Sequence, residues 1–125
     1  MPKEILIVDD EPSIVVPIQF LMEQQGYSVL VAENGEDALD AIYKYKPDLI
    51  LLDIMLPDLD GYEIYQMIRQ RTEWESIRVI FLTAKNRDAD LAKGIAMGAD
   101  AYITKPFSNM QLVEKIRELI GPGIP

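Results

Sequence analysis

The sequence contains no cysteine and no histidine, and these two absences exclude several kinds of chemistry. Without cysteine the chain can form no disulfide and offers no thiolate to a metal. Without histidine there is no imidazole ligand, and the Ser–His and Cys–His pairs of nucleophilic catalysis are impossible. Any chemistry in this chain must therefore use carboxylates, hydroxyls, lysine amines and backbone groups.

Positive charge is also scarce. Twelve lysines and arginines stand against 21 acidic residues, which leaves a net charge of −9. Because nucleic-acid surfaces depend on lysine and arginine, we expect no direct nucleic-acid binding by this chain. The same charge is compatible with an acidic cleft that holds a divalent cation.

Long apolar runs are absent as well, since no stretch approaches the roughly 18 residues that a membrane span needs. The first residues, 1–4, lead directly into a predicted strand and leave no room for a signal peptide. We therefore expect a soluble, cytoplasmic protein without membrane contact. The length of 125 residues suits one domain with a real core, predicted over 1–121. Residues 122–125, rich in Gly and Pro, are then a free tail or the start of a linker.

Short apolar runs alternate with helical patterns along the chain, which indicates repeated βα units and a parallel sheet. The runs are nearly continuous in apolar residues, as expected where helices cover both faces of a sheet. The predicted strands span 4–9, 28–32, 48–53, 78–83 and 101–104. Five predicted helices, each with a single apolar stripe, span about 12–25, 35–45, 61–71, 87–97 and 107–120. The predicted fold class is α/β.

Two residues stand out from this pattern. Pro17 falls inside the first predicted helix, where it removes a hydrogen bond, so we expect a bend there or a helix that becomes regular only after it. Trp74 precedes the fourth predicted strand, and we interpret it as loop packing.

Polar residues end four of the predicted strands. Asp53 directly follows the apolar run 49–52, and Asp9 and Asp10 follow the run 5–8. Thr83 and Lys105 close two further strands. In an open parallel sheet, ligands bind at the carboxyl ends of the strands, so these five residues are the candidate site.

This set of residues is suited to phosphoryl chemistry. Several carboxylates in one cleft repel one another, which raises a pKa or recruits a cation. Mg²⁺ prefers such oxygen ligands. Asp53 can act as a nucleophile toward phosphorus, while Thr83 and Lys105 stabilise charge on the phosphoryl oxygens.

Each of these residues also has a purely structural interpretation. Asp9 or Asp10 would serve as a helix cap, and Asp53 as a turn residue. Tyr102 suits a half-buried core position with a polar tip. The segment 58–61 hints at a calcium loop, but the ligand spacing and the closing glutamate are absent. The joint occurrence of these five residues at four strand ends favours the functional interpretation.

The whole pattern resembles the receiver domain of two-component response regulators, in the CheY-like superfamily, over residues 3–120. The motifs that carry the resemblance are Ile7-Val8-Asp9-Asp10-Glu11, Leu52-Asp53-Ile54-Met55-Leu56-Pro57, Asp60-Gly61, Leu82-Thr83-Ala84 and Lys105-Pro106-Phe107. The resemblance implies a doubly wound, flavodoxin-like (βα)5 fold with strand order 2-1-3-4-5. It also implies that Asp53 is the phosphoacceptor.

Further roles follow from the resemblance alone. Asp10, Asp53 and the backbone carbonyl of Met55 would hold Mg²⁺, or Mn²⁺ in its place, and Asp9 would act through a metal-bound water. Thr83 and Lys105 would contact the phosphoryl group, and Lys105-Pro106 would be a cis peptide. Thr83 and Tyr102 would form the switch that reshapes the face made by the fourth helix, fifth strand and fifth helix.

The implied partners are a histidine kinase or histidine phosphotransfer protein and a downstream protein or effector domain. A homodimer that forms on phosphorylation is a further option. The chain would then catalyse its own phosphorylation and slow dephosphorylation. A Mg²⁺-dependent aspartyl phosphatase usually carries a second Asp where Met55 stands, and a flavin-binding module would not place Asp9 and Asp10 beside a phosphate. A phosphorylation-independent scaffold would be expected to lack part of the reactive set.

Overall fold

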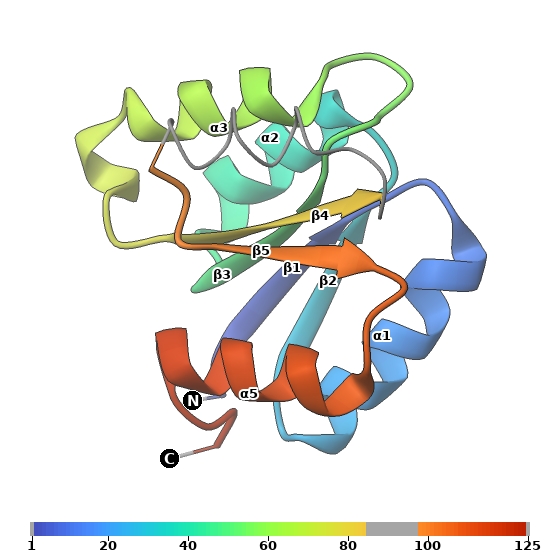
Figure 1. The fold of residues 1–125 in the computed structure, drawn as a ribbon. Coiled ribbons are helices and arrows are strands. Elements are labelled where there is room, and N and C mark those ends of the chain that lie inside the picture. The colour runs from blue at the N-terminus through green and yellow to red at the C-terminus, as the bar shows by residue number, and fades with distance from the viewer. Residues whose placement is uncertain (1, 85–97, 125) are drawn as a thin grey trace.

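The computed structural model describes residues 2–84 and 98–124. Five parallel strands form one sheet in the order β2-β1-β3-β4-β5 (Figure 1). The strands are β1 (Glu4–Val8), β2 (Ser28–Ala32), β3 (Leu49–Asp53), β4 (Arg78–Ala84) and β5 (Ala101–Lys105). The predicted α/β class and the strand order 2-1-3-4-5 are confirmed.

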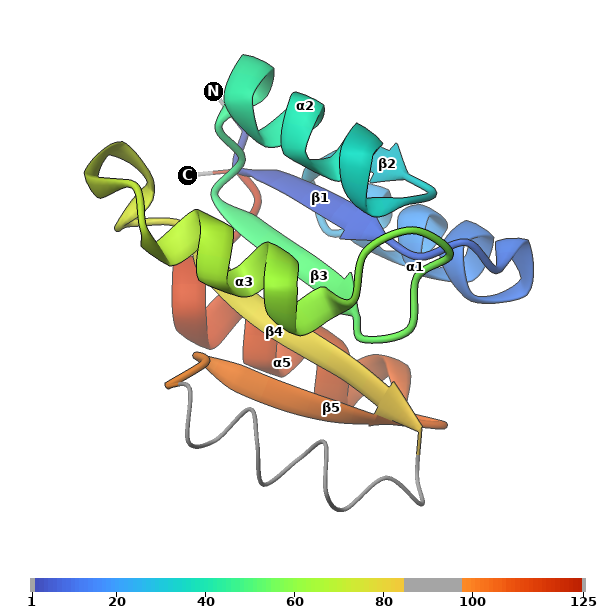
Figure 2. The same ribbon diagram turned by 90° about the horizontal axis from the view of Figure 1, so that it is seen from above.

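Helices cover both faces of this sheet, which makes the fold doubly wound. Figure 2 shows α2 and α3 on one face and α1 and α5 on the other. The helices are α1 (Pro12–Gln24), α2 (Gly35–Tyr45), α3 (Gly61–Arg69) and α5 (Asn109–Ile120), with a short 3-10 helix η1 (Thr72–Trp74). The helix predicted at 87–97 lies outside the described residues. Within the described ranges, no helix has the length and apolar character needed to cross a membrane.

The two faces of the sheet carry separate cores. In β1, Leu6 and Val8 pack with α2 and α3, whereas Ile5 and Ile7 pack with α1 and α5. All four side chains are fully buried. Because successive strand residues point to opposite faces, a strand covered on both sides must be apolar at every position. This explains why the runs in the sequence are continuous rather than alternating.

Pro17 does not delay the first helix. α1 is continuous from Pro12 to Gln24 with Pro17 inside it, so the expectation that the helix becomes regular only after this residue is wrong. The first turn is already formed ahead of Pro17, since Ile14 and Val15 both donate their N–H groups to the Glu11 carbonyl. Packing of Val15, Ile18 and Met22 into the core stabilises the helix on both sides of the proline.

Trp74 packs from the connecting segment before β4, in agreement with its interpretation as loop packing, although part of that segment is helical. Trp74 ends η1, is only 3% exposed and belongs to the core on the α2 and α3 face. The indole occupies a core position although it comes from a connecting segment, because η1 lies beside α3 and turns the ring inward.

The tail packs against the domain. The Lys3 N–H donates to the Gly123 carbonyl at 2.8 Å, and the Tyr27 hydroxyl donates to the Gly121 carbonyl at 2.6 Å. The start of β1 and the tail therefore lie side by side (Figure 1). Gly123 is buried, and a Cβ there would lie 2.4 Å from the carbonyl carbon of Gly26. Only glycine permits this approach. The boundary at residue 121 stays a prediction.

Candidate functional site

The carboxyl ends of four neighbouring strands meet at one edge of the sheet. Asp53 is the last residue of β3, Lys105 is the last of β5, and Thr83 lies near the end of β4. Asp9 and Asp10 directly follow β1, which pairs with β3. The parallel register aligns these ends, so residues up to 96 positions apart in the sequence come within bonding distance.

Lys105 links the two buried carboxylates of this edge. Its ammonium lies 3.1 Å from Asp9 Oδ2 and 3.6 Å from Asp53 Oδ2. Asp9 is fully buried, and its other oxygen accepts the Glu11 N–H at 3.0 Å. Asp53 is 6% exposed, and its Oδ1 accepts the Met55 N–H at 3.1 Å. One cation therefore serves two anions, and the acids at this edge keep excess negative charge.

The pKa values of Asp53 and Lys105 reflect this excess of negative charge. Burial raises the pKa of Asp53 from 3.8 to about 6, and the charges of Asp9 and Asp10 add to the effect. Lys105 and the Met55 N–H oppose this rise in pKa without cancelling it. Burial alone would lower the pKa of Lys105, but the charges of Asp53 and Asp9 outweigh it and raise that pKa above the usual value. Asp53 thus carries a destabilised negative charge next to a firmly protonated amine.

The acidic group also fits a divalent cation. One carboxylate oxygen from each of Asp9, Asp10, Glu11 and Asp53 lies within 4.8 Å of the others. Oxygen donors of this kind, exposed to solvent at Asp10 and Glu11, match the preference of Mg²⁺ for carboxylates and water. Glu11 was absent from the sequence-based set of ligands. Its position directly after Asp10, in the same strand-end loop, was the signal that could have identified it.

The loop between β3 and α3 fixes the backbone around Asp53. Gly61 donates its N–H to the Ile54 carbonyl at 2.8 Å, and a Cβ at Gly61 would lie 2.6 Å from the Asp53 carbonyl oxygen. Asp58 accepts the N–H groups of Gly35 and Leu59 at 2.7 and 2.8 Å, which ties the loop to α2. The acids of this loop thus cap helices, since Asp60 likewise accepts the Tyr62 and Glu63 N–H groups at the start of α3.

Two buried hydroxyls, the Thr83 Oγ1 in β4 and the Tyr102 hydroxyl in β5, have no hydrogen-bond partner within the described parts of the chain. Tyr102 lies opposite Phe81, two positions before Thr83 along β4. The Tyr102 ring stacks on Phe81, with ring centroids 5.5 Å apart. Tyr102 therefore lies against the core and outside the acidic group. The Lys105–Pro106 peptide bond is cis.

Comparison with known families agrees with this arrangement. The family model described as response regulator receiver domain matches residues 5–117, which is most of the chain. The chain belongs to this family. It is a receiver domain of two-component signalling, and receiver domains are switches controlled by phosphorylation.

Solved structures of other receiver domains are closely similar. A protein from Chloroflexus aurantiacus J-10-fl, taken to be a response regulator, is 33% identical with a TM-score of 0.91, and the match covers 95% of this chain and 98% of that one. The receiver domain of a signal transduction histidine kinase from Syntrophus aciditrophicus is 31% identical with a TM-score of 0.87 (94% and 89% covered). The chemotaxis response regulator CheY4 of Vibrio cholerae is 26% identical with a TM-score of 0.88 (96% and 100% covered).

Proposed function

We propose that Asp53 of this receiver domain accepts a phosphoryl group from the phosphohistidine of a histidine kinase or histidine phosphotransfer protein. The observation that carries the proposal is the placement of a nearly buried carboxylate, at a strand end, 3.6 Å from the Lys105 ammonium and among further acids. A purely structural carboxylate in such a place would be expected to have a complete set of partners. Asp53 instead retains a raised pKa, which indicates that a ligand or a covalent group is still to be accommodated.

The proposed reaction requires the Asp53 carboxylate, the phosphohistidine donor and a proton from water. An oxygen of the ionised Asp53 forms a bond to phosphorus while the phosphorus–nitrogen bond to the donor imidazole breaks, and the leaving imidazole takes its proton from water. Lys105 neutralises charge on the phosphoryl oxygens. Thr83 has a hydroxyl without a partner in the described parts of the chain, so it can donate to one of these oxygens.

The ligands for Mg²⁺ in this proposal are the Asp10 and Asp53 carboxylates and the Met55 carbonyl, with Asp9 acting through water. Mg²⁺, or Mn²⁺ in its place, would supply positive charge that neutralises the phosphoryl oxygens. Asp9 is the buried member of this set and is already paired with Lys105. It therefore also orients the ammonium toward Asp53.

Phosphorylation would be read out through Thr83 and Tyr102. When the Thr83 hydroxyl turns to the phosphoryl group, it would leave room for the Tyr102 ring. Phosphorylation would then increase the population in which that ring points inward. The face made by the fourth helix, β5 and α5 would then bind a downstream protein or effector domain, or a second copy of the chain. The helix predicted at 87–97, which would complete this face, lies outside the described residues.

Acetyl phosphate with Mg²⁺ tests the proposal directly. Intact mass spectrometry should show one acid-labile phosphoryl adduct, and Asp53→Asn should abolish it. Asp100→Asn is the matched control, because Asp100 is a carboxylate at the opposite end of the sheet, and it should keep the adduct. An Asp53→Asn protein that is labelled like the parent contradicts the proposal. Many turnovers of a phosphate ester per protein molecule would instead indicate a phosphatase.

A further inference from the structure

Three connecting segments lie at the carboxyl edge of the sheet. One follows β1 and begins with Asp9, the segment 33–34 leads from β2 into α2, and the segment 54–60 leads from β3 into α3. The first two are joined, because the Asp9 N–H donates to the Ala32 carbonyl at 3.1 Å. The third carries Met55, whose carbonyl is a Mg²⁺ ligand in the proposed function. It must be held close to the first if that carbonyl and the acids are to bind one cation.

Asp58 attaches this third segment to the start of α2, beside which it runs (Figures 1 and 2). Its Oδ1 accepts the Gly35 N–H at 2.7 Å, and its Oδ2 accepts the Glu36 N–H at 3.0 Å. Oδ1 also accepts the Leu59 N–H at 2.8 Å. The first N–H groups of a helix have no acceptor inside the helix, and a carboxylate placed there also interacts favourably with the helix dipole. Although Asp58 is exposed, both of its oxygens are thus occupied by backbone donors.

The helix that Asp58 contacts has a cap of its own. Asn34 Oδ1 accepts the Asp37 N–H at 2.8 Å, and Asn34 Nδ2 donates to Asp37 Oδ2 at 3.1 Å. Asn34 therefore provides the usual local cap of α2. What Asp58 adds is a connection between α2 and a loop that lies 22 or more residues further along the chain.

The chain between Met55 and Asp58 is short and stiff. Only Leu56 and Pro57 separate them, and the proline ring fixes its own φ and restricts the residue before it. At the other end of this stretch, the Met55 N–H donates to Asp53 Oδ1 at 3.1 Å. With both ends held and few free dihedral angles between them, the position of Asp58 determines where the Met55 carbonyl points.

We propose that Asp58 is a positioning residue for the cation site, and that its hold on the start of α2 keeps the Met55 carbonyl in place as a ligand. Asp58 acts through the loop, and the affinity of the acidic group for Mg²⁺ depends on it. This inference rests on the proposed function, in which Met55 is a Mg²⁺ ligand, and it deepens that function by naming a residue that sets the affinity.

Isothermal titration calorimetry with Mg²⁺, well below the melting temperature of every variant, tests the inference. Asp58→Ala removes all three acceptor contacts and should raise the Kd for Mg²⁺ about ten-fold, as is typical when a partner behind the metal ligands is lost. Asp58→Asn keeps one carbonyl oxygen as an acceptor, so its Kd should lie between those of the parent and Asp58→Ala.

Two further measurements distinguish positioning from a general loss of stability. In the metal-free protein, the Met55 N–H of Asp58→Ala should exchange with solvent faster than that of the parent. The rate of labelling by acetyl phosphate should fall in Asp58→Ala at limiting Mg²⁺ and approach the parent's rate at saturating Mg²⁺. This recovery is expected because Asp53, Thr83 and Lys105 are unchanged.

Two variants of α2 serve as controls. Asn34→Ala removes the other cap of the same helix, whose bonds run to Asp37, so it should lower the melting temperature and leave the Kd for Mg²⁺ unchanged. Glu36→Gln removes a negative charge from the same turn but keeps the backbone N–H that Asp58 accepts. Its Kd should change by less than about two-fold, since exposed charges are screened by salt.

An unchanged Kd for Mg²⁺ in Asp58→Ala overturns the inference, even if the variant melts at a lower temperature. An equal rise in Asn34→Ala or in Glu36→Gln also overturns it, because helix stability or net charge would then explain the effect. If Asp58→Ala does not fold, Asp58→Asn decides the question by the same comparison.

The inference and the proposed function can fail separately. A parent protein that binds Mg²⁺ but gains no acid-labile adduct refutes phosphoryl transfer to Asp53, whereas the Kd values of the variants still test Asp58. A parent protein that binds no Mg²⁺ overturns both the inference and the cation site of the proposed function.

Discussion

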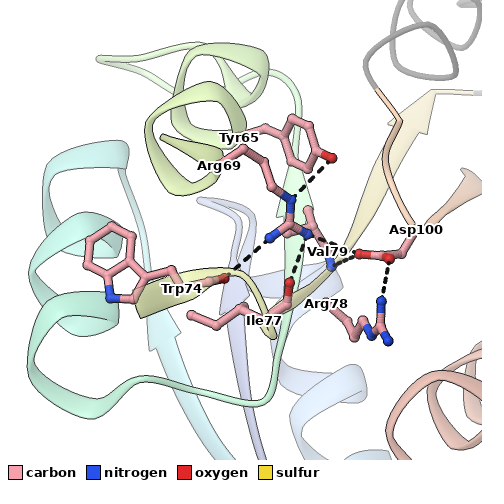
Figure 3. Close-up of polar contacts among 7 residues, drawn as sticks. All are labelled: Tyr65, Arg69, Trp74, Ile77, Arg78, Val79 and Asp100. Atoms are coloured by element: carbon pink, nitrogen blue, oxygen red, sulfur yellow. Dashed lines mark hydrogen bonds and ion pairs between the residues drawn. The ribbon is translucent and has the colours of Figure 1, made fainter. Parts of the chain in front are cut away.

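The charged residues at the two ends of the sheet differ in how fully their charges are paired. At the amino ends of β4 and β5, Asp100 accepts hydrogen bonds from Arg69, Arg78 and Val79 (Figure 3). At the carboxyl ends, Lys105 is shared between Asp9 and Asp53, further acids lie close by, and the pKa of Asp53 is raised to about 6.

This difference separates an ion network with balanced charges from one with an excess of negative charge. At the amino end each carboxylate oxygen of Asp100 has a donor, so the network can hold α3, β4 and β5 together without a ligand. At the carboxyl end the charges are left unbalanced, and a cation or a phosphoryl group would complete them. Strongly perturbed carboxylates at strand ends of an α/β sheet are therefore better guides to function than the number of ion pairs.

The largest effect should come from removing the Lys105 ammonium, which Asp9 and Asp53 share. Lys105→Gln leaves the fully buried Asp9 without its ammonium partner, and a buried charge that loses its partner typically costs about 3–5 kcal/mol. We expect a loss of that order in the free energy of unfolding, measured by urea denaturation in EDTA, together with loss of the phosphoryl adduct.

Lys115→Gln provides the matched control for this prediction. Lys115 pairs with Glu118 on the surface of α5, where such a pair contributes less than about 1 kcal/mol. Equal losses of unfolding free energy in Lys105→Gln and Lys115→Gln would contradict the prediction. They would show that the Lys105 ammonium contributes no more to stability than a lysine in a surface ion pair.

A smaller effect is expected from the ionisation of Asp53. Because its pKa in the folded state is about 6 rather than 3.8, the folded protein holds a proton that the unfolded chain has released, and stability falls as the pH rises from about 4 to about 6. Asp53→Asn cannot ionise. In EDTA its stability relative to the parent should grow by about 2–3 kcal/mol over that interval and then stay constant.

Asp58→Asn should change the pH dependence of stability in the opposite direction. Hydrogen bonds from backbone N–H groups, that of Gly35 foremost, lower the pKa of Asp58, so its contribution to stability is present at neutral pH and is lost as the pH falls.

The Asp53 prediction fails if the parent and Asp53→Asn show parallel profiles of stability against pH. Such profiles would mean that the charge of Asp53 is not destabilised by the fold.

The smallest expected effect is the gain in folding stability when Mg²⁺ binds. Binding of Mg²⁺ to the acidic group stabilises only the folded state, so about ten times its Kd should add about 1–2 kcal/mol, and EDTA should remove it. Thermal unfolding of the parent, Asp53→Asn and Asp100→Asn checks this. Asp100→Asn should keep the Mg²⁺ effect, and Asp53→Asn should lose most of it. Equal stabilisation of all three proteins would place the bound cation elsewhere.

Much of the fold could be predicted because its signals are local. The strands are continuous apolar runs bounded by turn residues, and the helix starts carry residues such as Asn34 and Asp60, whose side chains cap α2 and α3. The strand-end residues could be assigned to one site because parallel strands align their carboxyl ends. Of the two expectations for Pro17, the late start of a regular helix was wrong, since packing of α1 on the sheet compensates for one lost hydrogen bond, and the bend stays a prediction.

Contacts between distant segments could not be predicted. Arg69 and Asp100 are 31 residues apart, and neither residue has a pattern around it that indicates a partner. Trp74 is buried only because η1 folds back beside α3. The pairing of Asp58 with the start of α2 likewise depends on a loop conformation with no local signal.

The sequence by itself determined the α/β class, the order of the elements and the types of side chain available for chemistry, because periodicity, turn residues and composition act locally. Only the tertiary structure decided how those side chains share charge. Asp9 and Asp53 are buried around a single ammonium, that of Lys105, only when the strands pack. The hydrogen bonds from Arg69 to Ile77 and Asp100 likewise form only when α3 packs beside β4 and β5. Burial and proximity, which set a pKa and a hydrogen bond, do not exist until the chain has folded.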